Sequence, residues 1–436
     1  MRDQQENQLF TRFGDFINEG ASAFHVTRQA AALLSEAGWE ELKEEDAWQL
    51  APGRGYFVIR EGSSVAAFRV GTLSGEEQEF RISGAHTDSP ALKIKWEAVT
   101  DSHGYALLPV EVYGGPILST WIDRDLGMAG RLVCRGSQGL HYRLVKTDAV
   151  ASIPNLAIHL NRKVNEGFEY NKQDHLPAIL GRSSSSHSAR ESFLEILADA
   201  AGVTPDQIVR GDLFLYDPAP LQELSGGIYS SGRIDNIAGC FAGLAPLLDG
   251  SGGAATAIAF LYDNEEVGSR TRAGANSSFL PNLLERIVLS RGGSSEAVHR
   301  ARARSMIVSN DAAHGIHPAY ADKHDSAFAP LLGGGPVIKF NGSFRYTSTA
   351  ASASVFEELA ATVSVPLQYF ANRSDMPSGS TIGPFSSAHS GIPSVDVGVP
   401  ILAMHSIRES GGRSDLAAMV DVLNAFYQAD SLPHPA

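Results

Sequence analysis

The sequence is poor in cysteine, in excess positive charge and in long apolar runs. Its 436 residues include only two cysteines, Cys134 and Cys240, which are too few for a disulfide framework and indicate a reducing, cytoplasmic location. The 35 basic and 49 acidic residues give a formal net charge of −14, which argues against nucleic acid and anionic membranes as partners. No apolar run approaches the roughly 18 residues of a membrane span. The polar start of the chain, residues 1–8, does not resemble a signal peptide.

The order of apolar and polar residues predicts two kinds of domain. In residues 1–91 and 230–436, strand-like runs alternate with helical patterns, which favours an α/β fold with a mostly parallel sheet covered by helices on both faces. The main predicted strands are 79–83, 256–262, 305–309 and 394–397, and the last predicted helix, 416–427, has Ser414 or Asp415 as its N-cap. Between them, residues 92–229 carry short strand-like runs such as 106–113, and we expect an inserted β-rich domain there.

Two adjacent glutamates, Glu265 and Glu266, directly follow the predicted strand 256–262. Neighbouring carboxylates repel each other, so crowding them at a strand end does not stabilise a fold. A divalent cation changes this, because one glutamate can bind the metal while the other moves a proton. The residues alone leave open which glutamate does which, and a solvated loop is the alternative.

Further acids and histidines stand where other predicted strands end. In open α/β sheets, sites form beyond the carboxyl ends of the strands, so side chains far apart in the sequence can converge there. A solvated loop or a structural histidine explains any one of them, but not all of them at one sheet edge. The positions after strands are His86, Asp88, Asp311 and His405, and Asp235 opens a predicted helix in the same part of the chain.

The spacing of His86 and Asp88 has a specific use at a metal. A histidine that binds metal through one ring nitrogen needs an acceptor for its other N–H, and a carboxylate two residues later can provide it. An Asx-turn before Pro90 is the alternative.

The types of side chain also indicate the metal. Histidines with carboxylates, and no suitable cysteine pair, favour Zn²⁺, with Mn²⁺ or Co²⁺ able to substitute. So many ligands suit two ions that share one carboxylate. Such a pair meets the demands of removing the N-terminal residue from a peptide.

These motifs resemble the aspartyl aminopeptidase family of dinuclear zinc exopeptidases, in the right order over nearly the whole chain. The resemblance implies a zinc-exopeptidase-like fold and a role for each residue. His86 and Asp311 would bind one metal, Glu266 and His405 would bind the other, and Asp235 would bridge them. Glu265 would be the general base that takes a proton from the metal-bound water, and Asp88 would orient His86. The matching stretches are Gly-Ala-His-Thr-Asp-Ser-Pro at 84–90, Asp-Asn at 235–236, Asp-Asn-Glu-Glu-Val-Gly-Ser at 263–269, Asp311 with His314 and His317, and Ala-Met-His-Ser-Ile-Arg-Glu at 403–409.

The resemblance also implies partners and substrates. Residues 92–229 would form a dimerisation domain, dimers would assemble into a dodecamer, and His159 would reach into the partner's active site. Relatives prefer peptides with a free N-terminal Asp or Glu, which requires a cation in the pocket. Lys339 is our candidate, with Arg345 nearby, and Tyr346 and His317 complete the predicted substrate-binding set.

Two positions depart from the family pattern, and three alternatives remain open. Ala319 stands where relatives often have Asn, Ser378 stands where some have Cys, and neither is a proposed metal ligand. The first alternative is an aminopeptidase of the same fold that prefers neutral apolar residues. The second is a dinuclear zinc deacylase or carboxypeptidase, which must recognise the substrate's other end. The third, a non-catalytic scaffold, predicts eroded ligands, yet every proposed ligand is present.

Overall fold

The computed structural model describes residues 2–184 and 186–433. The chain divides into two compact units. The first unit contains Met1–Asp88, Leu221–Met404 and Glu409–Ala436, and the second contains Ser89–Pro220 and His405–Arg408. Within the described residues, no helix is both long and apolar enough to cross a bilayer.

The first unit is built on a nine-stranded sheet, ordered β1-β2-β3-β15-β4-β16-β20-β18-β19. The four strands β15, β4, β16 and β20 are parallel to one another, as are β18 and β19. β15 is buried along its whole length and has the predicted bounds. These features confirm the predicted α/β fold. The strands are β1 (Glu40–Glu41), β2 (Gly55–Arg60), β3 (Ser64–Arg69), β4 (Phe80–His86), β15 (Thr256–Tyr262), β16 (Met306–Asn310), β18 (Val337–Phe340), β19 (Gln368–Ala371) and β20 (Ser394–Gly398).

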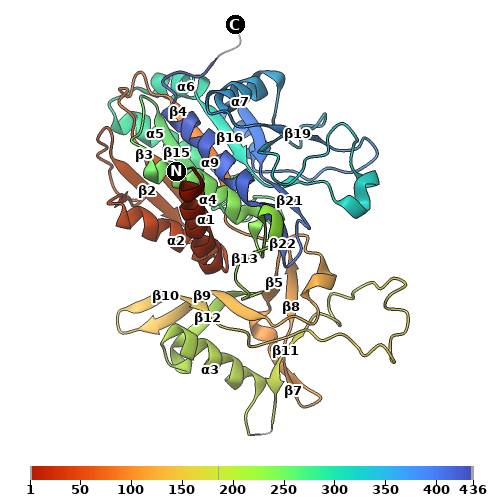
Figure 1. Cartoon of the computed structure of the whole chain (residues 1–436). Helices are drawn as coiled ribbons and strands as arrows, with labels where there is room; N and C mark the ends of the chain where they lie inside the picture. The colour runs from red at the N-terminus through yellow and green to blue at the C-terminus, as the bar shows by residue number, and fades with distance from the viewer. Residues whose placement is uncertain (1, 185, 434–436) are drawn as a thin grey trace. The chain divides into compact units, whose positions relative to one another are not determined.

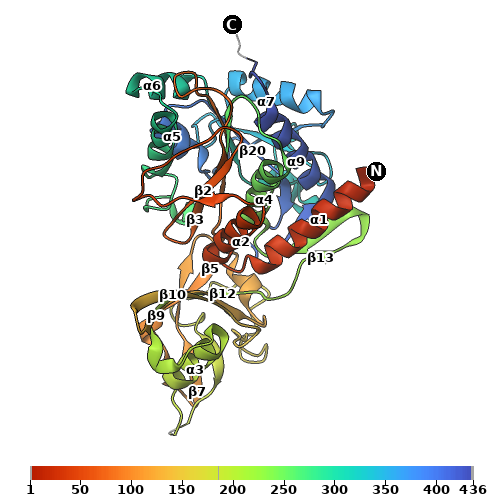
Figure 2. The ribbon, with the colours of Figure 1, turned by 90° about the vertical axis from the view of Figure 1, so that its left-hand side faces the viewer.

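Helices cover both faces of this sheet (Figures 1 and 2). Successive strand residues point to opposite faces, so Ala257 and Ala259 join one apolar core while Ile258 and Phe260 join the other. The first core packs against α1 (Arg2–Glu19), α2 (Ala23–Glu36), α4 (Ile234–Asp249), α7 (Ala350–Thr362) and α9 (Arg413–Gln428). The second packs against α5 (Phe279–Ser290), α6 (Ser295–Ala303) and α8 (Gly383–Ser390).

A smaller sheet in the same unit has the order β13-β14-β22-β21-β17. It joins β13 (Gln222–Glu223), β14 (Ile228–Ser231), β17 (Ala313–His314), β21 (Pro400–Leu402) and β22 (Glu409–Gly412). β14 leads directly into α4, and β22 leads into α9, so this sheet fixes where both helices begin.

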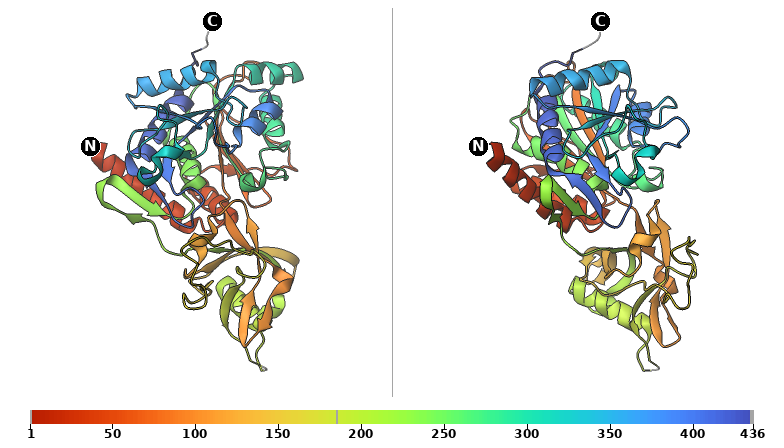
Figure 3. Two further views of the ribbon diagram at one scale, coloured as in Figure 1. Left: turned by 90° about the vertical axis from the view of Figure 1, so that its right-hand side faces the viewer. Right: turned by 45° about the vertical axis from the view of Figure 1, so that its right-hand side comes forward.

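The second unit is built of antiparallel strands and a helix (Figure 3). It has its own apolar core. One sheet has the order β10-β9-β12-β5-β8 and the other β11-β7-β6, and α3 (Ala189–Ala201) packs Phe193 and Leu197 into the core. The strands are β5 (Ala91–Ile94), β6 (Thr100–Ser102), β7 (Tyr105–Leu108), β8 (Val110–Tyr113), β9 (Gly127–Gly136), β10 (Gly139–Lys146), β11 (Ala178–Arg182) and β12 (Ile208–Tyr216).

The unit boundaries differ from the predicted 92–229 for a reason visible in the strand pairing. β5 pairs with β12 and β8, so the second unit already includes Ala91. β13 pairs with β14, and β14 pairs with β22, so the first unit resumes at Leu221.

Two local predictions were wrong. The predicted strand 106–113 is divided at Pro109, which has no N–H for a ladder, and β7 and β8 enter different sheets. The N-cap of α9 is Gly412, not Ser414 or Asp415. The Asp415 carboxylate instead accepts hydrogen bonds from the backbone N–H groups of Gly333 and Gly335, at 2.7 and 2.8 Å.

Candidate active site

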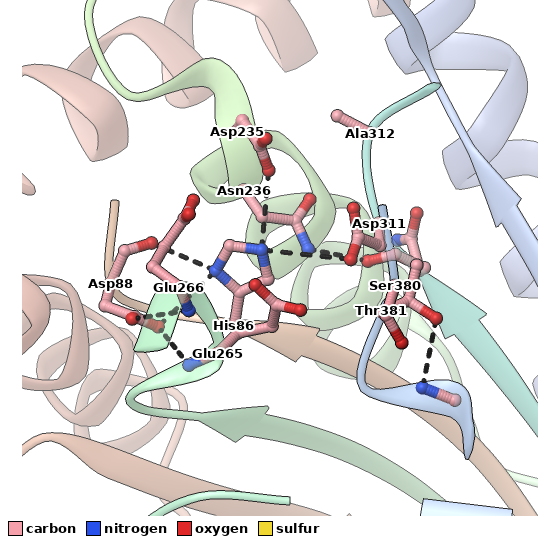
Figure 4. Close-up of polar contacts among 12 residues, drawn as sticks. His86, Asp88, Asp235, Asn236, Glu265, Glu266, Asp311, Ala312, Ser380 and Thr381 are labelled. Atoms are coloured by element: carbon pink, nitrogen blue, oxygen red, sulfur yellow. Dashed lines mark hydrogen bonds and ion pairs between the residues drawn. The ribbon is translucent and has the colours of Figure 1, made fainter. Parts of the chain in front are cut away.

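Three neighbouring strands of the large sheet bring most of the predicted site together (Figure 4). β4 ends at His86, β15 is followed by Glu265 and Glu266, and β16 is followed by Asp311. Because β15, β4 and β16 are parallel neighbours, their carboxyl ends meet at one edge of the sheet. Asp235 reaches the same edge from the start of α4.

Three of the predicted metal ligands surround a common point. One ligand atom from each of His86, Asp235 and Asp311 lies within 4.8 Å of the other two, and all three residues are buried. His86 Nε2 is 3.4 Å from Asp235 Oδ1 and 3.9 Å from Asp311 Oδ2. His86 forms a second such group with Glu265 and Glu266. One imidazole and several carboxylates converging in a buried site fit a divalent cation such as zinc.

The pKa shifts in the site reflect this burial of like charges. Burial raises the pKa of Asp311; the positive charge of Lys339 opposes the rise, and the negative charge of Asp235 adds to it. Burial also raises the pKa of Glu265 to about 8, which the charge of His86 opposes and Asp311 and Asp88 reinforce. Burial would lower the pKa of His86, but hydrogen bonds to Asp235 and Asp88 raise it well above its usual value.

Asp88 links His86 to the pair of glutamates. His86 Nδ1 lies 3.0 Å from the backbone carbonyl oxygen of Asp88 and 3.5 Å from its carboxylate. The same carboxylate accepts hydrogen bonds from the backbone N–H groups of Glu265 and Glu266, at 3.1 and 3.2 Å. Asp88 therefore contacts the ring that it is predicted to orient, and it also fixes the turn that carries both glutamates.

The ammonium group of Lys339 is directed at Asp311. Lys339 is only 2% exposed. Its Nζ donates hydrogen bonds to the carbonyl oxygens of Asp311 and Ala312, at 2.8 and 3.2 Å, and lies 3.6 Å from Asp311 Oδ1. It also lies 5.1 Å from the centre of the Tyr346 ring. These contacts give Lys339 a position from which it stabilises a predicted metal ligand.

A pocket of about 280 Å³ in the first unit contains His317. The described lining carries several basic side chains and no carboxylate: His314, His317, Lys323, His324 and Arg373 line it, along with Met404. His317 Nδ1 accepts a hydrogen bond from the backbone N–H of Ala319, at 3.2 Å, so this ring caps the turn that follows. Burial, reinforced by the charge of His317, lowers the pKa of His324, which leaves Lys323 and Arg373 as the permanent cations.

Two predicted site residues, His159 and His405, belong to the second unit. His405 Nδ1 is 3.1 Å from the carbonyl oxygen of Gly115, within that unit. His159 lies exposed in a loop. Their roles as metal ligand and as partner-reaching residue stay predictions.

Sequence reasoning assigned no role to three buried polar residues beside the metal ligands. The Glu409 carboxylate accepts a hydrogen bond from the backbone N–H of Asp235, at 3.0 Å. Asn236 and Asn310 are each 1% exposed and follow or precede a predicted ligand directly. Asn236 belongs to the matching Asp-Asn motif, whereas the only signal for Asn310 was its position before Asp311.

Comparison with known proteins extends over nearly the whole chain. The family model described as "Aminopeptidase I zinc metalloprotease (M18)" matches residues 16–427. A "Probable M18 family aminopeptidase 2" of Pseudomonas aeruginosa (strain UCBPP-PA14) is 44% identical over 424 residues, which cover 96% of this chain and 98% of that protein.

Solved structures agree with that match. The structure of the complex of Ape4 and Nbr1 has a TM-score of 0.94 and 32% identity, covering 97% of this chain and 86% of that chain. The S. cerevisiae mApe1 dodecamer has a TM-score of 0.83 and 26% identity, covering 97% of both chains. The resemblance seen in the motifs is thus confirmed, and this chain belongs to the M18 family of zinc metallo-aminopeptidases, hydrolases that act on peptides.

Proposed function

We propose that this aminopeptidase binds two zinc ions per subunit and uses them to release N-terminal Asp or Glu from peptides. The observation that carries the two-ion proposal is the convergence of His86, Asp235 and Asp311 around one point, with Glu265 and Glu266 beside the same histidine. Glu266 and His405 would hold the second ion, Asp235 would be shared, and Mn²⁺ or Co²⁺ could replace zinc. Bound zinc supplies a Lewis acid for the scissile carbonyl and lowers the pKa of the attacking water.

The protein's own groups then move the proton. Glu265 takes a proton from the attacking water and passes it to the leaving amine. Burial raises the pKa of Glu265 to about 8, which supports a role in proton transfer near neutral pH. A cation nearby would lower that pKa and favour the carboxylate that acts as base. Asp88 keeps the backbone of Glu265 in place by accepting its N–H.

The preference for acidic residues is supported by the basic lining of the 280 Å³ pocket. A substrate carboxylate there would meet Lys323 and Arg373, which also pair with Asp322 and Asp375 just outside the lining. Lys339 remains our sequence-based candidate as the selector, although its ammonium group is already bonded to Asp311 and Ala312. A preference for neutral apolar residues is the alternative.

Hydrolysis of Asp-, Glu- and Leu-anilides by wild type and Glu265→Gln tests this proposal, with Zn²⁺, Mn²⁺ or Co²⁺ added. The variant keeps the size of the side chain and removes the base, so we expect bound zinc to persist while kcat falls about 10²–10⁴-fold. N-blocked peptides should resist the wild type, which separates this activity from a deacylase or carboxypeptidase.

Undiminished turnover by Glu265→Gln would contradict the assignment of the base. Faster cleavage of the Leu-anilide by wild type would keep the mechanism and replace the acidic preference with an apolar one.

The second unit supports assembly into dimers and a dodecamer. It exposes large apolar side chains, with Leu140 and Tyr142 each 66% exposed and Leu160 75% exposed, next in sequence to His159. Exposed apolar groups of this size favour a protein partner, and the mApe1 relative is a dodecamer. Light scattering should give a mass near twelve chains.

The variant His159→Ala should keep the mass of the assembly and lose activity, because the proposed role of His159 is in the partner's site. A monomer with full activity would contradict both parts of this proposal.

A further inference from the structure

Two buried asparagines connect the chain segments that carry Asp235 and Asp311. Asn236 Nδ2 donates a hydrogen bond to the backbone carbonyl oxygen of Asn310, at 2.8 Å. Asn310 Nδ2 donates to the carbonyl oxygen of Gly239, at 3.0 Å. We call this pair of side chains, Asn236 and Asn310, the asparagine clasp. It joins the start of α4 to the end of β16 across more than seventy residues of sequence.

Gly239 shows independently how closely the two segments approach. A Cβ atom at this position would lie 2.3 Å from Asn236 Oδ1 and 2.6 Å from the carbonyl oxygen of Asn310. Neither distance is tolerable for a carbon atom, so a side chain here would force the segments apart. A glycine inside a helix is usually unfavourable by about 1 kcal/mol, and here the close packing explains it.

The clasp keeps a buried polar atom at a cost to stability. Among the described residues, Asn236 Oδ1 is buried and has no hydrogen-bond partner, as is also true of Gln78 Oε1. Burying an unsatisfied polar atom costs about 1–3 kcal/mol, so the place of the amide in the fold must be considered as well as its burial. The feature that the amide does provide is a fixed distance between the residues next to Asp235 and Asp311.

That distance matters because the two carboxylates repel each other. Figure 4 shows Asn236 among His86, Asp235 and Asp311, at the point where the ligand atoms converge. Without a cation, repulsion favours a wider separation of Asp235 and Asp311, and a site that has opened must close again before it can bind metal. A rigid connection between their backbones lowers this cost of reorganisation.

We propose that the asparagine clasp holds Asp235 and Asp311 at the separation that zinc requires before zinc binds. Asn236 and Asn310 are thus positioning residues, which act on the metal site through the backbone of its ligands. This inference depends on the proposed zinc site at His86, Asp235 and Asp311. It predicts that loss of the clasp weakens zinc binding in the whole protein, apart from any effect on turnover.

The test compares Asn310→Ala and Asn236→Ala with a matched control, Gln78→Ala. Gln78 is fully buried in the same unit, and its amide also donates two hydrogen bonds, to Glu79 O at 2.7 Å and Thr256 Oγ1 at 2.8 Å. It precedes β4, whereas His86 ends that strand, so it lies at the other end of the sheet from the ligands. The control loses buried amide bonds without changing the site.

Each variant is stripped of metal, and its zinc affinity is measured by competition with a chromogenic chelator. Zinc per chain is counted after dialysis, and urea unfolding of the metal-free protein gives stability. We expect both clasp variants to bind zinc about 10–100-fold more weakly than wild type, as for other residues that orient metal ligands. Gln78→Ala should lose a similar amount of stability and bind zinc like wild type.

Gly239→Ala provides a second variant that keeps both amides, in case an alanine variant does not fold. It should also weaken zinc binding, because the added methyl group separates the segments. If Asn310→Ala, Asn236→Ala and Gly239→Ala all bind zinc as tightly as wild type, the proposed role of the clasp is wrong. Absence of zinc binding by wild type would instead overturn the proposed metal site itself, so the two failures are distinguishable.

Discussion

The active-site edge and the basic pocket of the first unit hold their charges in opposite ways. At the edge, the carboxylates of Asp235 and Asp311 are buried beside the buried side chains of His86 and Lys339, respectively. In the pocket, the side chains of Lys323 and Arg373 are 57% and 44% exposed and pair with neighbouring acids on the same loops. Buried charges with fixed partners suit bond cleavage, which needs precise geometry. Exposed charges on loops suit recognition of a variable substrate.

Removing the metal should have the largest effect, and it acts on the active-site edge alone. Dialysis against a chelator should abolish hydrolysis of every substrate, and added zinc should restore it, because all the buried ligands serve one centre. The melting temperature should fall too, since a ligand at 100 times its Kd stabilises the folded state by about 2.7 kcal/mol. Calorimetry with and without zinc checks this expectation. Full activity of a metal-free sample would show that the active-site edge cleaves peptides without a metal, and the contrast with the basic pocket would then lose its basis.

Replacing cations in the two regions should separate cleavage from recognition. Arg373→Ala should raise KM for the Asp-anilide about tenfold. KM for the Leu-anilide should not change. Lys339→Met should lower kcat for both anilides, because Asp311 loses the ammonium group beside it. Steady-state kinetics on both substrates measures the difference, with Arg300→Ala as the control. Arg300 is a half-exposed arginine of α6 that pairs with Glu76.

The opposite result would be equally informative. If Lys339→Met slows hydrolysis of the Asp-anilide alone, Lys339 selects the substrate, as the sequence suggested. The basic pocket is then not the site that recognises the acidic side chain.

The smallest effect is expected from replacing a buried carboxylate outside both regions, which tests how burial alone changes the dependence of stability on pH. Burial raises the pKa of Asp415 to about 6, although the N–H groups of Gly333 and Gly335 oppose this. The folded state therefore holds the proton more tightly than the unfolded state, whose Asp pKa is near 3.9. Stability from this group is fully present below about pH 4 and is lost as the pH rises to about 6. Between pH 4 and 6, the free energy of unfolding of the wild type should therefore fall by an amount on the order of 2–3 kcal/mol that Asp415→Asn does not lose.

Urea unfolding of Asp415→Asn and wild type at pH 4 to 7 measures this slope. Parallel curves for the two proteins would show that the hydrogen bonds from the glycines cancel the cost of burial.

The sequence predicted the central strands and the residues at their ends because both signals are local. β15 is a continuous apolar run, and its bounds were predicted correctly. His86, Glu265 and Asp311 each follow such a strand, and the parallel order of the sheet is enough to bring them together. The family motifs then supplied roles that spacing alone left open.

Contacts between distant residues were beyond prediction. β18 and β19 have only four residues each, too few to show a period, and the partner of Lys339 depends on how β18 lies against the loop after β16. The N-cap of α9 was mistaken because Asp415 is a typical capping residue. Its carboxylate is bound instead by two glycines about eighty positions away.

The two cysteines allow the opening of each unit to be followed separately. Cys134 lies in the second unit and Cys240 in the first, and both are fully buried. Burial also raises the pKa of Cys240 to about 12, so little of the reactive thiolate exists at neutral pH. A thiol reagent should therefore modify each cysteine only when its own unit opens. Peptide mapping after timed labelling would give two independent opening rates from one unmodified protein, and these rates would show whether the units unfold together.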